Sequence, residues 1–218
     1  MRGGIWNGLD LTEAAIQRAK SRFSIKETNF GEVKQGSALD IPWKDNCFDI
    51  VYSHGVLHHI PNILCAQKEL HRVLKKDGKL VVMLYNKRSI NYYISILILR
   101  RFGLLVLYFF AKLRLFNYGK DNVFSRHVKM AQEQGLISYL KKENFIHVNT
   151  DGPENPYSKV YTLDTVKRDF PLFEIEKANV HFLNKRHFPG IDILPKRLTN
   201  FLERNYGWHL WVYLKPQK

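Results

Sequence analysis

Residues 48–61 of the chain read FDIVYSHGVLHHIP. The first five of these residues predict a β-strand because most of them are apolar, β-branched or aromatic. Pro61 opens a helix, and Lys75–Gly78 has the lysines and glycine expected at its carboxyl end. The unbroken apolar run 80–84 follows, as in a strand covered on both faces. Strand, helix and strand in this order predict parallel pairing with helices on the sheet.

The segment before residue 48 extends the same alternation. Residues 5–9 predict a short strand that ends at Asp10. Thr12 is a helix N-cap residue, and the apolar positions that follow predict a helix over residues 12–23. Residues 32–36 can form a further strand. The fold class expected is therefore α/β, with a Rossmann-like, doubly wound, mostly parallel sheet.

The carboxyl-terminal half of the chain is less regular. Helices are expected over residues 90–116, 128–143, 163–170 and 194–205, and strands over 173–182 and 208–214. The two late strands suit an antiparallel hairpin at the sheet edge, and the stretch 151–157 is rich in turn residues. We expect three regions: a core over 1–86, a helical insertion or lid over 87–150, and a carboxyl-terminal part of the core over 151–218.

The composition limits the kinds of protein that the chain can be. Its 218 residues, 45% of them hydrophobic, suffice for a sizeable core. Cys47 and Cys65 are too few for a disulfide framework, and the start of the chain has no signal-peptide pattern, so a cytoplasmic protein with reduced thiols is expected. The net charge of +14 favours anionic partners such as an acidic membrane face or nucleic acid.

Three ordered blocks of sequence resemble the motifs of one enzyme family. They are Gly8–Ala15, Gly36–Pro61 and Glu69–Leu80. Together these blocks resemble the second strand, the adenine loop, and the fourth and fifth strands of class I S-adenosylmethionine-dependent methyltransferases. The likeness is to small-molecule methyltransferases with a type 11-like domain, similar to quinone-pathway C-methyltransferases.

The resemblance implies a set of cofactor contacts. A carboxylate at the end of the second strand can accept two hydrogen bonds from a cis-diol, so Asp10 would hold the ribose. The adenine loop would supply contacts to the base, and the end of the fourth strand would lie beside the methionine part. The residues expected to contact S-adenosylmethionine are Asp10, Leu11, Ser37, Ala38, Leu39, Ser53, His54, Gly55 and Val56.

The chain departs from the family in two respects. Ser37 stands where many relatives have Asp, which weakens the expected contact to adenine. The family's first strand and glycine-rich cofactor loop have no counterpart before Ile5, so we expect an amino-terminally truncated domain. That strand lies at the centre of the family's sheet, and its loss would leave two strand edges unpaired and weaken cofactor binding.

Candidate substrate contacts lie at the ends of two strands. His58 and His59 follow the fourth strand and could act as a base or orient a substrate oxygen. The alternative is that these histidines bind backbone groups near a helix start. Tyr85 ends the fifth strand and faces the same crevice. We expect no metal: His54 and His58 are four residues apart, but Gly55 occupies the place of the Glu that zinc peptidases carry between two such histidines.

The stretch 87–118 combines apolar runs with basic residues. Arg100 and Arg101 divide the apolar runs, which makes a transmembrane span costly. Two interpretations remain: a lid packed over the active site, or a helix lying in an anionic membrane surface.

The function expected is methyl transfer to a small acceptor, which may be hydrophobic or lipid-like. The alternative is a non-catalytic remnant that binds a membrane or a protein through its basic surface. We do not expect a nucleic-acid partner, because only the charge supports it. The Asn-Pro-Pro-Tyr signature of base methyltransferases is also absent after the fourth strand, although Asn155-Pro156-Tyr157 resembles it elsewhere.

Overall fold

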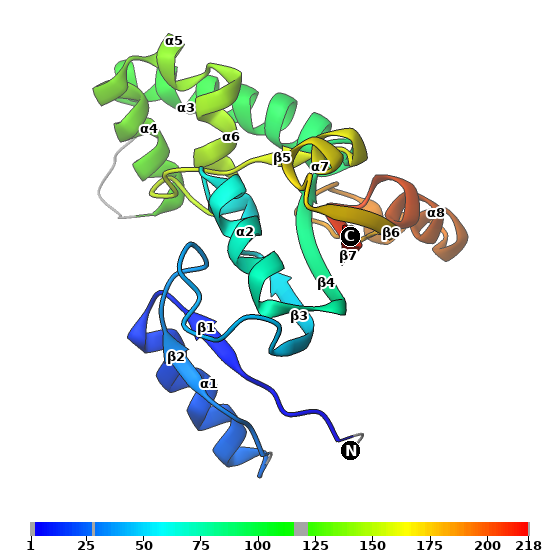
Figure 1. The fold of residues 1–218 in the computed structure, drawn as a ribbon. Helices are drawn as coiled ribbons and strands as arrows, with labels where there is room; N and C mark the ends of the chain where they lie inside the picture. Colours follow the sequence, from blue (N-terminus) through cyan, green and yellow to red (C-terminus); the bar gives the residue numbers. More distant parts are fainter. Residues whose placement is uncertain (1–2, 28, 116–121, 218) are drawn as a thin grey trace.

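The computed structural model describes residues 3–27, 29–115 and 122–217, and it shows the expected mixture of helices and strands (Figure 1). Residues 116–118 of the basic apolar stretch lie outside the described residues. The strands are β1 Gly8–Asp10, β2 Val33–Gln35, β3 Phe48–His54, β4 Leu74–Asn86, β5 Val160–Tyr161, β6 Phe173–His181 and β7 His209–Pro216.

The strands form two sheets. In the larger sheet the order is β3-β4-β7-β6, with β5 beside the carboxyl end of β4. β3 and β5 run parallel to β4, whereas β7 is antiparallel to both β4 and β6. β1 and β2 form a separate parallel pair. This α/β arrangement confirms the Rossmann-like fold class, with the antiparallel β6 at the edge of the larger sheet.

A cavity of about 400 Å³ separates the two sheets. It lies between β1 and β3, and Leu9, Val51, Leu57 and Leu70 contribute to its apolar wall. Within the described residues, no strand pairs with the free edge of β1 or with that of β3. This is where the family resemblance places the first strand of the sheet.

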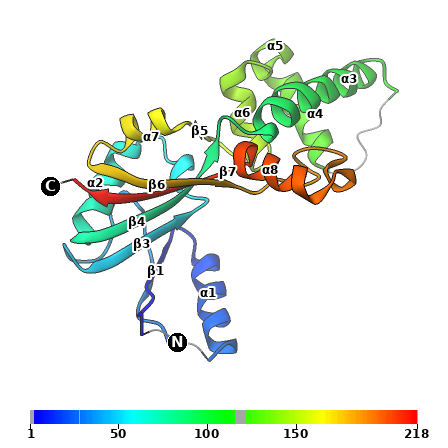
Figure 2. The same cartoon turned by 90° about the vertical axis from the view of Figure 1, so that its right-hand side faces the viewer.

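The main core covers one face of the larger sheet. The buried residues Leu80, Val82 and Leu84 of β4 pack there with α2 Ile63–Val73 and α7 Leu163–Asp169. Both helices lie on the same side of the sheet in Figure 2. The apolar run 80–84 therefore lies in a buried strand, as expected.

A helical group projects beyond the carboxyl end of β4 (Figure 2). A second buried cluster joins it to the sheet, with Tyr92 and Phe145 from the helices and Met83 and Trp208 from the strand side. Its elements are η2 Asn91–Arg100, a π-helix, then α3 Arg101–Lys112, α4 Val123–Gln134, α5 Leu136–Tyr139 and α6 Lys142–Thr150.

The remaining helices follow the sequence pattern. Thr12 caps α1 Glu13–Ile25 by accepting a hydrogen bond from the Ala15 N–H. The connection between β6 and β7 contains the short η3 Ile191–Ile193 and α8 Lys196–Tyr206. A further short helix, η1 Leu57–His59, follows β3.

Two expected helix boundaries are wrong. The helix over residues 61–78 ends at Val73, and Lys75–Gly78 belongs to β4 instead. Gly78 is needed there because a Cβ would lie 3.2 Å from the Asp49 carbonyl oxygen of the neighbouring strand. The single helix expected over residues 128–143 is three helices, because Gly135 has a φ of +83° and ends α4.

Gly135 and Gly103 give a matched test of this interpretation. Replacing Gly135 with Ala should lower the free energy of unfolding by about 1–3 kcal/mol, because its backbone conformation is unfavourable for any residue with a Cβ. Replacing Gly103 should raise it by about 0.5–1 kcal/mol, since Gly103 lies inside α3 and a Cβ there meets no atom within 4 Å. Urea unfolding measures both changes, and equal effects would contradict the interpretation.

Candidate active site

The two segments expected to bind adenosine lie side by side. β1 and β2 run parallel with Asp10 opposite Gln35, and the Gly36 N–H donates to the Asp10 carbonyl oxygen at 2.9 Å. Both segments therefore reach the same edge of the small sheet. Had they been at opposite ends of the strands, a shared nucleoside site would have been ruled out.

The Asp10 side chain is already held in place by its neighbour. Its Oδ1 accepts hydrogen bonds from the backbone N–H and the hydroxyl of Thr12, each at 2.9 Å. Both contacts use the same carboxylate oxygen. Oδ2 is therefore the atom through which Asp10 could accept a further hydrogen bond from a hydroxyl donor.

The loop after β2 is fixed to helix α2. Arg72 donates to the carbonyl oxygens of Ile41 and Trp43, each at 2.8 Å, and pairs with Glu69 at 2.7 Å. Glu69 in turn accepts from the Ile41 N–H at 2.8 Å. The hydrogen bond from Arg72 is the main cause of the lowered pKa of Glu69. This part of the Glu69–Leu80 motif thus anchors the chain just beyond the expected adenine segment.

The segment after β3 turns sharply toward the sheet edge. Gly55 has a φ of +75°, which suits glycine. Of the residues expected to contact the cofactor, four line the cavity between β1 and β3: Ala38, Ser53, His54 and Val56. The others are near this cavity in sequence but do not line it: Asp10, Leu11, Ser37, Leu39 and Gly55.

The residues present fit part of the expected cofactor. A carboxylate, an anchored loop and the end of a parallel strand meet near one apolar cavity, as a nucleoside site in an open α/β sheet requires. The cavity also fits an extended strand, since two unpaired strand edges bound it. The two adenosine segments thus lie side by side, whereas most of the expected contacts that line the cavity come from the segment expected beside the methionine part.

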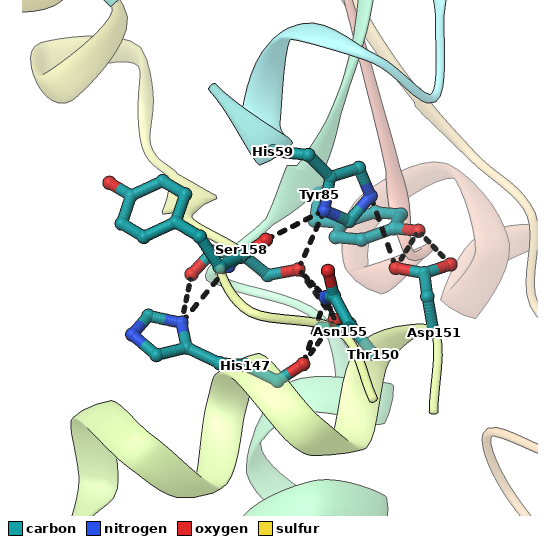
Figure 3. Close-up of polar contacts among 8 residues, drawn as sticks. His59, Tyr85, His147, Thr150, Asp151, Asn155 and Ser158 are labelled. Carbon is teal, nitrogen blue, oxygen red and sulfur yellow. Dashed lines mark hydrogen bonds and ion pairs between the residues drawn. The ribbon is translucent and has the colours of Figure 1, made fainter. Parts of the chain in front are cut away.

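A second polar cluster lies at the carboxyl ends of β3 and β4 (Figure 3). His59 Nε2 lies 3.2 Å from Asp151 Oδ2, and the Tyr85 hydroxyl donates to both Asp151 oxygens at 2.8 and 2.9 Å. On the other side of the ring, His59 Nδ1 lies 2.8 Å from the Tyr157 carbonyl oxygen. A carbonyl accepts only, so Nδ1 carries a proton in this geometry.

His59 and Asp151 each stabilise the charged form of the other. Burial alone would lower the pKa of His59, but the hydrogen bonds with Asp151 and the Tyr157 carbonyl outweigh it and raise the pKa. Burial likewise would raise the pKa of Asp151, but hydrogen bonds from His59 and Tyr85 lower it. The arrangement therefore stabilises an imidazolium beside a carboxylate.

A hydrogen-bond network holds the loop that carries Tyr157. Asn155 Nδ2 donates to the His147 carbonyl oxygen at 2.9 Å and to Ser158 Oγ at 2.6 Å. Ser158 Oγ also lies 2.7 Å from Thr150 Oγ1 and 3.0 Å from His59 Nδ1 (Figure 3). Asn155 is thus a positioning residue within the turn-rich stretch, and the turn borders the site.

The structure separates the three residues proposed as substrate contacts. His58 is fully buried, and burial lowers its pKa to about 3, so it is a neutral packing residue against the Tyr85 ring at 3.8 Å between centroids. Tyr85 is also buried and binds Asp151. His59 remains partly exposed, with 25% of its side chain accessible. Only His59 of the three is placed to meet a substrate directly.

Sequence reasoning missed Asp151 as a functional residue. It follows α6 in the helical region, and 92 residues separate it from His59 in the chain. Among the described residues, His58, His59 and Asp151 also form a group that could hold a metal ion, with ligand atoms within 4.8 Å of one another. The direct pairing of His59 with Asp151 accounts for two of these atoms without an ion.

The arrangement of strands and helices resembles that of one class of enzymes. Parallel strands with an acidic residue at the end of β1, helices on the sheet and an antiparallel β6–β7 pair are the arrangement of class I S-adenosylmethionine-dependent methyltransferases. Residues 2–82 match the methyltransferase domain family. Over residues 2–82 the chain is therefore similar to this class of methyltransferases.

Sequence relatives match about a third of the chain. An uncharacterized protein of Methanocaldococcus jannaschii is 42% identical over 69 residues, and a demethylmenaquinone methyltransferase of Staphylococcus epidermidis is 36% identical over 76 residues. These matches cover 32% and 35% of this chain. They span 28% and 31% of the two relatives, so less than a third of either protein is represented.

Solved structures resemble the whole chain. A S-adenosylmethionine-dependent methyltransferase from Methanosarcina mazei has a TM-score of 0.54 at 14% identity, over 96% of this chain and 81% of its own. A protein from Pyrococcus horikoshii has a TM-score of 0.52 at 16% identity, over 99% and 73%. At this level of identity the likeness establishes the fold alone.

Proposed function

We propose that this protein transfers a methyl group from S-adenosylmethionine to a small, hydrophobic acceptor that loses a proton in the reaction. The observation that carries the proposal is the pairing of His59 with Asp151 at 3.2 Å, at the carboxyl edge of parallel strands. Ligands of open α/β sheets bind at this edge. The aromatic rings of Tyr85 and Trp208, stacked at 4.4 Å, support an apolar surrounding.

The cofactor supplies a methyl group that is already activated by its positive sulfur. Asp10 would hold the ribose through Oδ2, and the anchored segment after β2 would flank the adenine. The remaining work of the protein is to align the acceptor and to remove its proton.

His59 is suited to take up that proton. In its neutral form Nδ1–H donates to the Tyr157 carbonyl, and the Nε2 lone pair lies beside the Asp151 carboxylate at 3.2 Å, so an acceptor must enter next to Asp151 to reach Nε2. Proton transfer from an acceptor hydroxyl or amine to Nε2 forms an imidazolium, which the adjacent Asp151 carboxylate stabilises. Tyr85 keeps Asp151 in position through its hydroxyl. The acceptor thereby becomes more nucleophilic as the methyl group is transferred.

Replacing Asp151 with Asn should shift the pH dependence of the reaction. The neutral base dominates above the pKa of His59, so kcat/KM should rise with pH and level off above that pKa. Asp151 contributes to raising this pKa, so its loss should move the rise to lower pH and reduce the plateau, by roughly tenfold or more. S-Adenosylhomocysteine formation with a panel of phenolic and quinol acceptors measures the profile.

Two other results would contradict this role of the His59–Asp151 pair. An unchanged pH profile in Asp151→Asn would contradict the role of the pair. Loss of activity in EDTA that added Zn²⁺ restores would show that the same residues hold a metal ion instead.

A second candidate function is a non-catalytic module that binds a membrane or a protein. The segments expected to bind the cofactor lie on two separate sheets, with a cavity between the unpaired edges of β1 and β3. This separation is the observation that favours the second function. Cofactor binding distinguishes the two functions, because only the methyltransferase needs Asp10.

A further inference from the structure

One long helix exposes an apolar face. η2 and α3 follow each other without a break from Asn91 to Lys112, and this stretch is apolar and long enough to cross a membrane. Only 22% of its apolar stretch is buried. A core helix of this hydrophobicity would be mostly buried, so its exposure requires an explanation.

The exposed side chains form one stripe. Phe102, Phe109 and Leu113 are 67%, 57% and 66% exposed, and their spacing of seven and four residues places them on one face of the helix. Ile98, Leu99 and Phe110 extend the stripe. We call these six residues the apolar face.

The opposite side of the same helix is fixed to the protein. Tyr92, Ile96 and Leu104 are buried in the cluster that also contains Tyr85 and Trp208. This side closes over the carboxyl end of β4, as expected of a lid. The helix therefore cannot leave the protein to span a bilayer without exposing that cluster.

The side chains of the two central arginines, Arg100 and Arg101, also contact the rest of the protein. Arg100 donates to the Asn149 carbonyl oxygen, and the Arg101 guanidinium lies 5.1 Å from the Phe145 ring centroid. In the sequence these residues divide the apolar runs. In the structure they leave the apolar face uninterrupted.

The exposed charges that flank the apolar face in the sequence are positive. Arg88 precedes the helix, and Lys112 and Arg114 lie at its end; all three are exposed. Residues 87–115 contain no Asp or Glu, and the whole chain carries a net charge of +14. An apolar stripe with cationic ends is complementary to an anionic bilayer surface, where the apolar side chains enter the headgroup boundary.

We propose that the apolar face binds the surface of an anionic membrane, with the helix lying parallel to the bilayer. The proposal does not depend on methyl transfer. It would hold the cluster around Tyr85 on the side of the helix that faces away from the bilayer.

Vesicle co-sedimentation tests this proposal. The intact chain should bind vesicles of phosphatidylcholine with about 30% phosphatidylglycerol at low salt, and bind pure phosphatidylcholine vesicles much less. The double variant Phe102→Gln/Phe109→Gln should lower the partition constant by at least about tenfold, because two large exposed rings no longer enter the boundary. Lys112→Gln/Arg114→Gln should lower it by about fivefold per charge on anionic vesicles only.

Ile193→Gln is the matched control, because Ile193 is 86% exposed on η3, outside this helix. It should bind vesicles like the unsubstituted chain, and circular dichroism should show that all variants are folded. Equal binding by the double phenylalanine variant would overturn the proposal. So would absence of vesicle binding together with a dimer, detected by sedimentation velocity, that the same variant dissociates, since the face would then join two copies of the chain.

Discussion

Replacing His59 with Asn lowers kcat/KM for methyl transfer by about 10²- to 10⁴-fold, if His59 removes the acceptor proton. Asn has nearly the size of His and can still donate to the Tyr157 carbonyl, but it cannot take up a proton near neutral pH. The affinity for S-adenosylmethionine should stay within about twofold of its original value, because His59 lies outside the segments that would hold the adenosine. Single-turnover formation of S-adenosylhomocysteine measures the loss.

His71→Asn is the control for this variant. His71 is also partly buried, but it lies on α2 and packs against Phe173 at 5.6 Å between ring centroids. Its replacement should leave kcat/KM unchanged. Full activity of His59→Asn would show that the acceptor needs no base, and the His59–Asp151 pair would then be structural.

The local sequence predicted the parallel βαβ unit well. The alternation around residues 48–84 depends on neighbouring residues only, because each strand and helix buries a face that its own periodicity specifies. Thr12 capping α1 is likewise a local effect, since the hydroxyl binds a backbone N–H three residues later. These features require no knowledge of distant contacts.

The errors arose where a distant segment decides the conformation. Lys75–Gly78 has the composition of a helix end, but Leu74 and Lys79 on either side of it pair with Phe48 and Ile50 of β3, and the segment becomes an irregular part of β4. Gly135 is a single residue in an otherwise helical pattern, and only its backbone angle shows that it divides the helix. Local composition did not distinguish a glycine tolerated in a helix, such as Gly103, from one that ends it.

Only some residues of the candidate active site could be predicted from the sequence. His59 and Tyr85 could be found because strand ends at one sheet edge lie close together. Asp151 could not, because its position depends on how the helical group packs and on the network around Ser158. The distinction between His58 and His59 also required the structure, because these adjacent residues of the same type differ in burial and in the partners of their rings.

Substitution of Asp10 tests whether the amino-terminal half of the chain binds S-adenosylmethionine. Replacing Asp10 with Ala should weaken S-adenosylmethionine binding by about 10- to 150-fold, the range expected when hydrogen bonds to a charged group are lost. Equilibrium dialysis at high protein concentration measures this loss of affinity, even when the unsubstituted chain binds S-adenosylmethionine weakly. We expect weak binding because the two sheets are separate.

Thr12→Ala separates cofactor binding from folding in this experiment. It removes the hydroxyl, one of the two donors to Asp10 Oδ1, together with the cap of α1, and should cost about 1 kcal/mol of stability while the carboxylate and its backbone donor remain. If Asp10 binds ribose, Thr12→Ala should retain most of the affinity that Asp10→Ala loses. Equal affinities for the unsubstituted chain and Asp10→Ala would mean that the carboxylate serves only to begin α1, and the non-catalytic module would then be the better account of this chain.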